Sequence, residues 1–594
     1  MFPTRFLLFL LVLGLLPPLS AQTSPPSARL HALLAEEWEY EMRTHPEEAT
    51  ALGDKRYDDR ISDRSPEAHA ADLDRTRKFL ADFEAVPDKG LSEQDRLNRT
   101  LMIRDLRESL DAYQFKFWET PFSQFGGFHL NAAGLPSLTS FTTAEDYENY
   151  LKRLHQFPHA FDQIIANARQ GMKDGLMPPK ILLEQVVPQA ESIAAKTDDS
   201  SPFAAPLKKF PDSVSKADQE RLRRDILAAI KNEIAPAYVK FARFVKDEYA
   251  PHGRTEPGIW ALPDGAARYR YAIHTLTTTD LDPETIHKLG LQQVAEIEAE
   301  MLEVAHKLGF KDVDALNEHI RNDRKLYGAS GEQIKGLYQK YTDQMYPELP
   351  RLFGRLPKSK LTVVPMESFR EKAGVPADYS EGSVQSGRPG RINVNMSDPE
   401  KRLLLNVEAI AYHEGIPGHH LQLSLGQEME GLPQFRRHAG YTAFVEGWAL
   451  YSERLAKEVG FYQDPYSDYG RLENEMWRAI RLVVDTGVHH KHWSRQQMVD
   501  YFHKYTAMDE PNIQTEVDRY IAWPAQALAY KLGQLRILQL REKAKAELGS
   551  TFDIRAFHDE LLGASALPLD VLEQRMVAWI AANKPRSAKL SGPE

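Results

Sequence analysis

The residues best suited to chemistry lie at positions 411–422, in the segment AYHEGIPGHHLQ. His413 and Glu414 match the first two residues of the motif H-E-x-x-H. In that motif, two histidines one helical turn apart bind zinc and the glutamate serves as general base. The second histidine of that motif is missing, because the chain has a proline four residues after His413. The next histidines are His419 and His420. The segment therefore predicts a zinc site only if the helix is interrupted between its histidines.

The interruption is predicted at residues 415–418, GIPG. A regular helix would place His419 about 120° around the axis from His413 and about 9 Å along it, and His420 within about 20° but about 10.5 Å along. Proline removes a backbone N–H and clashes with the preceding turn, while glycine permits unusual dihedral angles. We interpret GIPG as an insertion that returns one of these histidines to His413. The alternative is three solvated helix residues.

A third ligand is predicted on the next helix, at positions 441–459. Glu446 and Glu453 are seven residues apart and share one face of it. The spacing between His419 and Glu446 leaves room for a helix end, a turn and a second helix packed beside the first. A glutamate so placed completes a His-His-Glu zinc site with an open position for water. Glu453 has two interpretations: a surface ion pair with Lys457, four residues later, or a residue that supports a ligand.

The elements that must position these residues are mostly helices. The apolar residues follow a helical period over most of the chain, and we predict long helices at 28–53, 65–86, 92–116, 143–172, 214–249, 283–308, 330–347, 399–428, 440–459, 467–491 and 512–547. Strand-forming residues cluster at 360–366 and 391–396, on either side of a Gly/Ser-rich segment. The sequence therefore predicts a mostly α fold with a small β-sheet directly before the histidine helix.

Composition excludes several classes of site. The chain has 594 residues, a net charge of -11 and no cysteine. Disulfides and thiolate ligands are therefore excluded, and a metal must be bound by His, Asp or Glu. This donor set favours a zinc site of the type found in hydrolases. The negative charge argues against nucleic acid or an anionic membrane as the main partner. The oligomeric state does not follow from the sequence.

The N-terminus has the pattern of a secretory signal peptide. One arginine precedes an apolar run at positions 6–16, which is followed by two prolines and by the small-residue exit Ser20-Ala21. The run is too short to span a bilayer. We therefore expect residues 1–21 to be removed, and the mature protein, residues 22–594, to be periplasmic or secreted without stable insertion in the membrane.

Four stretches carry a resemblance to a known family: HEGIPGHHLQ, FVEGWALYSE, LTTTDLDPETIHKLGL and FDIRAFHDELLGASALPLDVL. They resemble the bacterial family catalogued as domain of unknown function 885 (DUF885), from about residue 28 to 582. That family is similar to gluzincin metallopeptidases such as thimet oligopeptidase, angiotensin-converting enzyme and carboxypeptidase Taq. The resemblance implies a two-lobed, mostly helical metallopeptidase-like fold with a deep channel. It would be a single domain with an N-terminal lobe at about 28–260 and a catalytic lobe at about 261–594.

The resemblance also implies a choice of ligands. The zinc helix of such peptidases carries a Gly-His pair, which matches Gly418 and His419 and favours His419 over His420. Their glutamate ligand often lies in the context E-x-W, which matches Glu446 and Trp448. The resemblance therefore implies zinc bound by two histidines and one glutamate.

Two further site elements are implied by the same relatives. A strand that pairs with the substrate backbone beside the zinc matches 390–395, GRINVN, for which the alternative is an ordinary edge strand. A downstream histidine that stabilises the oxyanion matches His489. Alternatively, Arg481, Asp485 and His489 form a solvated ladder of charges at four-residue steps.

Tyrosines of a late helix, 518–536, are implied as well. Tyr520 and Tyr530 are candidates for contacts with the transition state and the substrate terminus. Arg519 or Lys531 could pair with a peptide carboxylate. The alternative is a buried helix whose hydroxyl groups are satisfied in the core.

These inferences predict an exported zinc metallopeptidase, a hydrolase of short peptides. Zinc bound by His413, His419 and Glu446 would activate a water, and Glu414 would take its proton and pass it to the leaving amine. The predicted channel would exclude folded proteins. One alternative is a peptide-binding protein on the same fold without turnover, against which an intact Glu414 argues. The other is a zinc hydrolase of a non-peptide amide or ester. Exopeptidase and oligopeptidase modes are not separated by the sequence.

Overall fold

Helices make up most of the protein. The computed structural model describes residues 25–367, 370–371 and 375–584, and helices occupy most of these ranges, which confirms the predicted mostly α fold. The expected signal peptide at 1–21 and the cleavage site before Gln22 lie outside the described residues. Of the helices that the structure describes, none combines the length and the apolar character needed to cross a membrane.

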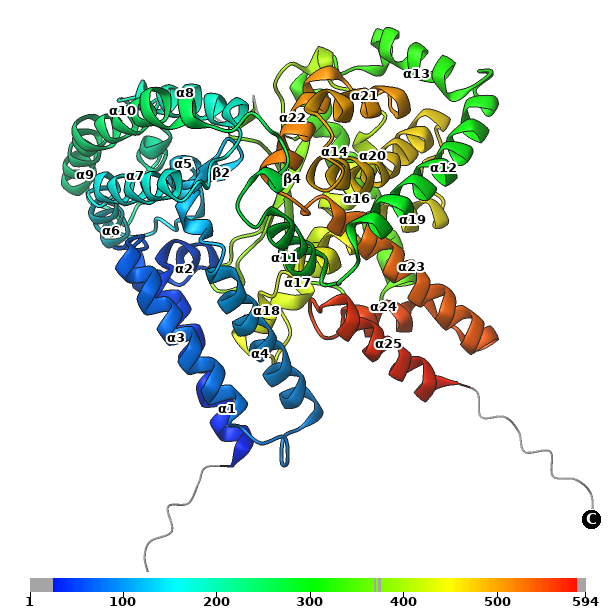
Figure 1. The fold of residues 1–594 in the computed structure, drawn as a ribbon, viewed down its shortest axis with the longest axis horizontal. Coiled ribbons are helices and arrows are strands. Elements are labelled where there is room, and N and C mark those ends of the chain that lie inside the picture. Colours follow the sequence, from blue (N-terminus) through cyan, green and yellow to red (C-terminus); the bar gives the residue numbers. More distant parts are fainter. Residues whose placement is uncertain (1–24, 368–369, 372–374, 585–594) are drawn as a thin grey trace, which may run out of the picture.

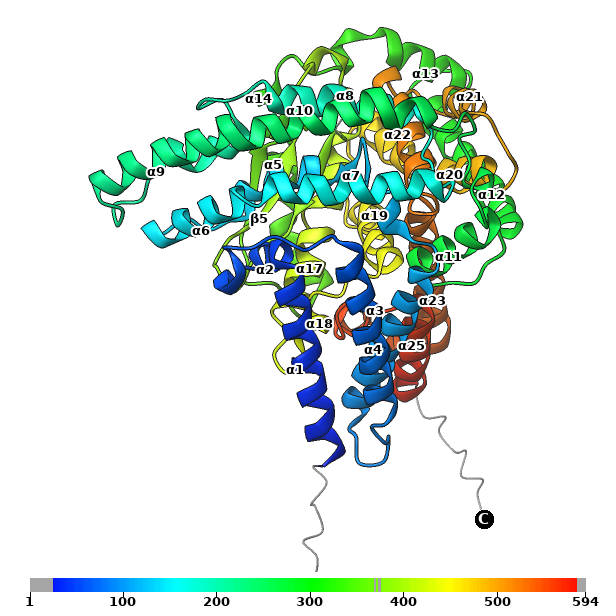
Figure 2. The same cartoon turned by 60° about the vertical axis from the view of Figure 1, so that its left-hand side comes forward.

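The first ten helices form one side of the molecule (Figure 1). Helices α1, α3 and α4 extend downwards together, and α5 to α10 pack above them, as the two views show (Figure 2). Their bounds are α1 Pro26–Thr44, α2 Pro46–Leu52, α3 Pro66–Glu84, α4 Glu93–Tyr113, α5 Phe128–Leu138, α6 Ala144–Leu154, α7 Phe157–Lys173, α8 Lys180–Ala194, α9 Lys216–Ala229 and α10 Ala235–Phe244.

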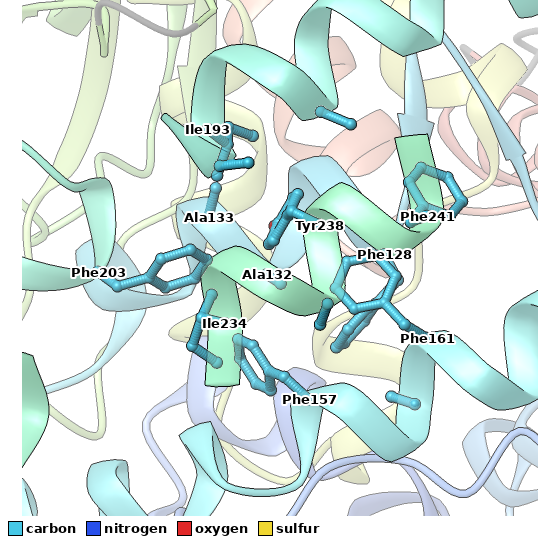
Figure 3. Close-up of a cluster of buried hydrophobic side chains, with 14 of the residues drawn as sticks. Phe128, Ala132, Ala133, Phe157, Phe161, Ile193, Phe203, Ile234, Tyr238 and Phe241 are labelled. Carbon is cyan, nitrogen blue, oxygen red and sulfur yellow. The ribbon is translucent and has the colours of Figure 1, made fainter. Parts of the chain in front are cut away.

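The core between α5 and α10 is rich in aromatic side chains (Figure 3). The ring of Phe161 lies 4.8 Å from that of Tyr238 and 5.3 Å from that of Phe241. Phe128 lies 5.2 Å from Phe157. Each such side chain buries about 150–250 Å². These helices therefore have a hydrophobic core of their own, separate from the residues with candidate chemistry.

The remaining helices carry those residues and form the other side of the molecule (Figure 1). Their bounds are α11 Gly265–Thr277, α12 Pro283–Lys307, α13 Val313–Asn322, α14 Gly331–Met345, α15 Leu349–Leu352, α16 Val407–Glu414, α17 His419–Gln427, α18 Gln434–Arg437, α19 Thr442–Glu458, α20 Pro465–His489, α21 Arg495–Tyr505, α22 Glu510–Ala522, α23 Leu528–Leu548, α24 Ile554–Leu562 and α25 Leu569–Asn583.

Helix α20 runs through the centre of this second group. It begins where the carboxylate of Asp464 accepts the backbone N–H of Tyr466, with Pro465 in the first turn. It packs against α12, α16 and α23, and every residue at positions 469–489 is buried. Charged side chains on such a helix must be paired inside the protein or face a cavity, because an isolated buried charge is costly.

Helices α19 and α23 cross at two glycines. A Cβ atom added to Gly533 would overlap the carbonyl oxygen of Ala443, and one added to Gly447 would overlap the backbone of Gly533. The backbones therefore touch only because neither helix has a side chain at the crossing. Glu446 and Tyr530 lie within one turn of this point, so the crossing sets their separation.

A three-stranded sheet lies next to the histidine helices. The central strand β5, Gly390–Val394, pairs in parallel with β3, Leu361–Pro365, and antiparallel with β4, Ala377–Ser380. The predicted small sheet is therefore confirmed. The prediction that 390–395 is an edge strand is wrong, because the backbone of β5 is paired on both sides. The strand β4, which begins before the Gly/Ser-rich segment, is an edge strand. Two-residue strands, β1 Phe122–Ser123 and β2 Gly126–Gly127, form a separate pair.

The predicted helices 28–53 and 143–172 are each divided in two, the first into α1 and α2 and the second into α6 and α7. Two more, 399–428 and 512–547, are divided next to the candidate site. Of these two, the first is broken between α16 and α17, at residues 415–418. The second is broken between α22 and α23, where the helix ends before Pro524 and Ala525 has a φ of +67°. Both breaks lie beside candidate site residues. Outside the predicted ranges the structure adds α5, α8, α11, α13, α15, α18, α21, α24 and α25.

Candidate metal centre

The break between α16 and α17 brings two histidines together. The backbone N–H of Gly418 donates to the carbonyl of Tyr412 at 3.0 Å, so the chain turns sharply after α16. A Cβ atom at Gly418 would overlap the carbonyl oxygen of His413, and only glycine fits this turn. The rings of His413 and His419 consequently lie 4.9 Å apart, at 88° to each other.

Helix α19 adds a carboxylate to this pair. The Oε2 atom of Glu446 lies 3.5 Å from Nε2 of His413 and 3.4 Å from Nε2 of His419. One ligand atom from each of the three residues lies within 4.8 Å of the other two. In a tetrahedral zinc site with bonds of about 2.1 Å, neighbouring ligand atoms are about 3.4 Å apart. The three side chains therefore have the spacing that one divalent cation requires.

The electrostatics of Glu446 also fit a cation. Burial alone would raise the pKa of this carboxyl, but the contacts with His413 and His419 hold the pKa well below its ordinary value. Its Oε2 atom is buried and has no hydrogen-bond partner among the described residues. A buried carboxylate oxygen between two imidazole nitrogens is stabilised by a positive charge at that point. The donor set thus suits Zn²⁺, which prefers histidine and carboxylate ligands.

A second carboxylate orients the first ligand. The Nδ1 atom of His413 donates to Oε1 of Glu453 at 2.8 Å, and both side chains are buried. This bond leaves the lone pair of Nε2 facing Glu446, as in the carboxylate–histidine pairs that support metal sites. The surface ion pair with Lys457 is wrong, because that lysine pairs with Asp468 at 2.8 Å. Glu453 instead supports a candidate ligand.

His420 lies away from the cluster. Its Nε2 atom donates to the carbonyl of Ser359 at 3.2 Å, and its Nδ1 atom accepts from the hydroxyl of Tyr379 at 3.0 Å. Burial lowers the pKa of His420 to about 4. Both ring nitrogens are therefore engaged elsewhere. Of the two histidines proposed as second ligand, the structure brings only His419 to His413. His420, the following residue of α17, points away from His413 because consecutive residues of a helix lie about 100° apart.

The cluster faces a cavity of about 320 Å³. His413, Glu414, His419 and Glu446 line it, together with Tyr530. Burial raises the pKa of Glu414 to about 8; the Glu446 carboxylate adds to this, and His419 opposes it. A carboxyl group with a pKa near neutrality is suited to accept and return a proton. The structure thus brings the predicted base to the predicted ligands.

The two candidate tyrosines have different places. The ring of Tyr530 stacks on that of His413, with centroids 6.3 Å apart, and lines the cavity. The hydroxyl of Tyr520 lies behind the cavity wall, where it accepts from Arg481 at 2.9 Å and donates to Glu516 at 2.5 Å. Tyr520 therefore belongs to a buried hydrogen-bond network outside the cavity. This agrees with the alternative interpretation of 518–536 as a buried helix whose hydroxyl groups are satisfied in the core.

His489 is also remote from the cavity. Its Nδ1 atom accepts the backbone N–H of Ile259 at 3.0 Å, and its Nε2 atom donates to the carbonyl of Tyr520 at 2.9 Å. Burial lowers the pKa of His489 to about 3. The histidine is thus a neutral link between two backbone segments, which leaves it no free nitrogen for an oxyanion. Asp485 is likewise buried and accepts from the hydroxyl of Tyr269 at 2.6 Å, so the solvated ladder is wrong as well.

Three arginines line the same cavity as Glu414 and Glu446: Arg478, Arg481 and Arg519. Arg478 was missed by the sequence analysis, although its position about one helical turn before Arg481 was a usable signal. Lys531 does not line the cavity. Its buried ammonium group donates to Glu475 at 2.8 Å.

Two solved structures, each described as a "putative lipoprotein", are similar to the chain. The one from Colwellia psychrerythraea is 28% identical, with 94% of this chain and 100% of that chain covered and a TM-score of 0.87. The one from Shewanella oneidensis is 17% identical, with 93% and 100% covered and a TM-score of 0.68, and shows similarity of fold alone. The comparison with curated proteins yields no match.

The family comparison covers the whole candidate site. A family model described as "Bacterial protein of unknown function (DUF885)" matches residues 46–576. This range contains the histidine helices, the supporting Glu453 and the arginines of the cavity. It also agrees with the family to which the sequence motifs pointed. The protein is therefore a member of the DUF885 family.

Proposed function

We propose that the protein is an exported zinc-dependent metallopeptidase that hydrolyses short peptides. The observation that carries this proposal is the placement of Glu414 beside the cluster of His413, His419 and Glu446, in one cavity. A binding protein has no use for a carboxyl group whose burial raises its pKa to about 8 next to such a cluster. The signal-like N-terminus and the lipoprotein descriptions of the two similar structures support export.

The roles of the residues follow from their positions. His413, His419 and Glu446 would hold Zn²⁺, which supplies a Lewis acid to the reaction. Glu414 would accept a proton from the attacking water and return it to the leaving amine. Tyr530 lines the same cavity, and its hydroxyl would donate a hydrogen bond to the oxyanion that develops on the scissile carbonyl.

A peptide substrate is supported by the edge of the sheet. Residues 375–379, at the start of β4, line the cavity, and among the described residues β4 pairs with β5 on one side only. An extended peptide can add to such an open edge through backbone hydrogen bonds. We therefore assign to β4 the part in substrate binding that the sequence analysis had assigned to β5.

The proposal includes the architecture of a channel. The helices before residue 261 and those after it would act as the two lobes of one domain, with the cavity at the base of the channel between them. A cavity of about 320 Å³ accommodates a few residues of an extended chain and no folded protein. This volume supports short peptides as substrates.

The deciding experiment combines metal analysis with a peptide-library digest of the purified mature chain. We expect about one zinc per chain and cleavage of short peptides by the wild type. Glu414→Gln should retain zinc and lose activity by roughly 10²–10⁴-fold, since it keeps the shape of the side chain but not its basicity. Glu430→Gln, at an exposed position shortly after α17, is the matched control.

Other outcomes separate the alternatives. Full activity in Glu414→Gln would contradict the mechanism. Peptide binding by a zinc-loaded wild type without turnover would favour a binding protein. Hydrolysis of esters or other amides, with peptides left intact, would favour a non-peptide hydrolase.

A further inference from the structure

The arginines of the cavity are almost completely buried. The exposed fractions are 4% for Arg478, 2% for Arg481 and 8% for Arg519. The first two extend from α20 and the third from α22, and all three line the cavity beside the candidate metal centre. Three guanidinium groups removed from water in one place are costly unless carboxylates or a ligand compensate them.

The protein compensates these charges only in part. The Oε2 atom of Glu516 accepts from Arg481 at 3.1 Å and from Arg519 at 2.9 Å. Arg478 faces Glu453 at 3.7 Å, but that carboxylate also accepts from His413. Within ion-pair distance, the described part of the chain thus offers two carboxylates to these three guanidinium groups.

The hydrogen bonds of the arginines are incomplete as well. One nitrogen of each is buried without a partner among the described residues: Nε of Arg478, Nη1 of Arg481 and Nε of Arg519. Buried guanidinium nitrogens normally have partners, so the cluster has both charge and donors available for an anion.

The position of the cluster relates it to the reaction. The guanidinium of Arg481 lies 4.2 Å from the ring centroid of Tyr530, and that ring stacks on His413 at 6.3 Å. One side chain therefore separates the cationic end of the cavity from the candidate ligands. Because an extended peptide advances about 3.3–3.6 Å per residue, an anion bound by the arginines would lie about one to three residues from a bond held at the metal.

We propose that Arg478, Arg481 and Arg519 form a subsite for a carboxylate of the substrate. Guanidinium groups bind carboxylates through paired, charge-assisted hydrogen bonds. This inference rests on the proposed peptidase function and deepens it, since it makes the enzyme a peptidase that cuts close to a free C-terminus. The same chemistry would also recognise an acidic side chain, and the experiment separates these two sources.

The test uses three forms of one short, N-acetylated peptide. They are the free acid, the C-terminal amide, and the amide with glutamate as its last residue. We expect the zinc-loaded wild type to cleave the free acid with a kcat/KM roughly 10- to 100-fold above that of the first amide, the factor that one charged hydrogen-bonded contact supports. Recovery of this factor by the glutamate-ended amide would identify a side-chain carboxylate as the ligand. Equal cleavage of acid and both amides would overturn the subsite and leave the peptidase function intact.

Variants connect the preference to the arginines. Arg519→Gln should lower kcat/KM for the free acid by roughly 10- to 100-fold more than kcat/KM for the amide, so that the preference disappears. Arg519→Lys keeps the charge but not the paired N–H donors of the guanidinium group, so its preference for the free acid should be intermediate. Arg495→Gln is the matched control, because Arg495 pairs with the neighbouring Asp518 and does not line the cavity. An equal loss on acid and amide in Arg519→Gln would contradict the subsite.

A binding measurement keeps this inference separate from the peptidase function. The Glu414→Gln variant, loaded with Zn²⁺, should bind the free acid more tightly than the amide in a calorimetric titration, whether or not the wild type turns peptides over. If the wild type cleaves no peptide but this preference is present, the proposed function fails and the carboxylate subsite stands. If both peptides bind equally or not at all, the subsite fails.

Discussion

The Nδ1 atom of His413 lies 2.8 Å from the Oε1 atom of Glu453, and both side chains are buried. This contact ties the end of α16 to the middle of α19, the helix that also carries Glu446. One helix therefore supplies both a candidate ligand and the group that orients another. The bond also determines which nitrogen of His413 is free to bind a metal.

The first prediction concerns this contact. Glu453→Ala should weaken Zn²⁺ binding by about 10- to 100-fold, because it removes the acceptor that fixes the tautomer and orientation of His413. A competition titration with a chromophoric chelator measures the change. Glu458→Ala, at the partly exposed end of the same helix, is the control and should bind Zn²⁺ as the wild type does. An unchanged affinity in Glu453→Ala would show that the contact has no part in metal binding.

The second prediction concerns the choice of histidine. His419→Ala should abolish stoichiometric zinc binding, because it removes one of three protein ligands. His420→Ala should retain about one zinc per chain, since both nitrogens of His420 bond to other groups. Elemental analysis of the two purified variants checks this. Retention of zinc by His419→Ala together with its loss from His420→Ala would reverse the assignment.

The third prediction concerns the turn between the histidines. Gly418→Ala should lose zinc and be less stable by about 1–3 kcal/mol or more, because the new Cβ atom would overlap the carbonyl oxygen of His413. Denaturant unfolding and metal analysis measure the two effects. Gly440→Ala is the matched control, since a Cβ atom there meets nothing within 4 Å. A wild-type zinc content in Gly418→Ala would mean that the turn can relax without moving the ligands.

The fourth prediction concerns pH. His558 accepts from the hydroxyl of Tyr451 at 2.8 Å and donates to the carbonyl of Leu352 at 2.9 Å, and burial lowers the pKa of His558 to about 3. The unfolded chain, with a histidine pKa of about 6.5, binds a proton that the folded chain does not. Stability therefore falls as pH decreases below about 6.5, by about 1.4 kcal/mol per pH unit for this residue.

The variant His558→Gln isolates this contribution. It should be less stable than the wild type at pH 7, and the difference should shrink by about 2 kcal/mol at pH 5, where the wild type has lost part of the stability that the neutral histidine contributes. Urea unfolding at the two pH values measures the free energies. A difference that is the same at both values would contradict the assigned pKa.

Local features of the sequence predicted much of the fold and part of the site. Residues 415–418 carried the break in the helix, because proline and glycine act on the backbone at their own positions. The seven-residue spacing of Glu446 and Glu453 placed both on one face of α19, because that spacing is two helical turns. These features need only the geometry of a single helix or turn.

Other features depended on contacts between distant segments. Strand β5 is central because β3 and β4 both pair with it, which its own residues do not reveal. His489 shares a helix with Arg481 but lies about 12 Å further along it, and only the packing of α20 shows where the cavity ends. The arginines of α20 and α22 likewise meet at one cavity only because these two helices pack together, which the sequence of neither helix reveals.

The crossing of α19 and α23 has a consequence for how this cavity can vary among related proteins. At Gly447 and Gly533 the two backbones touch, so no change of rotamer can absorb a shift between the helices there. The distance from Glu446 to Tyr530 is thus set by direct contact between the main chains of α19 and α23. Side chains elsewhere around the cavity can be exchanged, and specificity altered, without loosening the geometry of the metal ligands. A single methyl group at Gly447 or Gly533, by contrast, would push α19 and α23 apart.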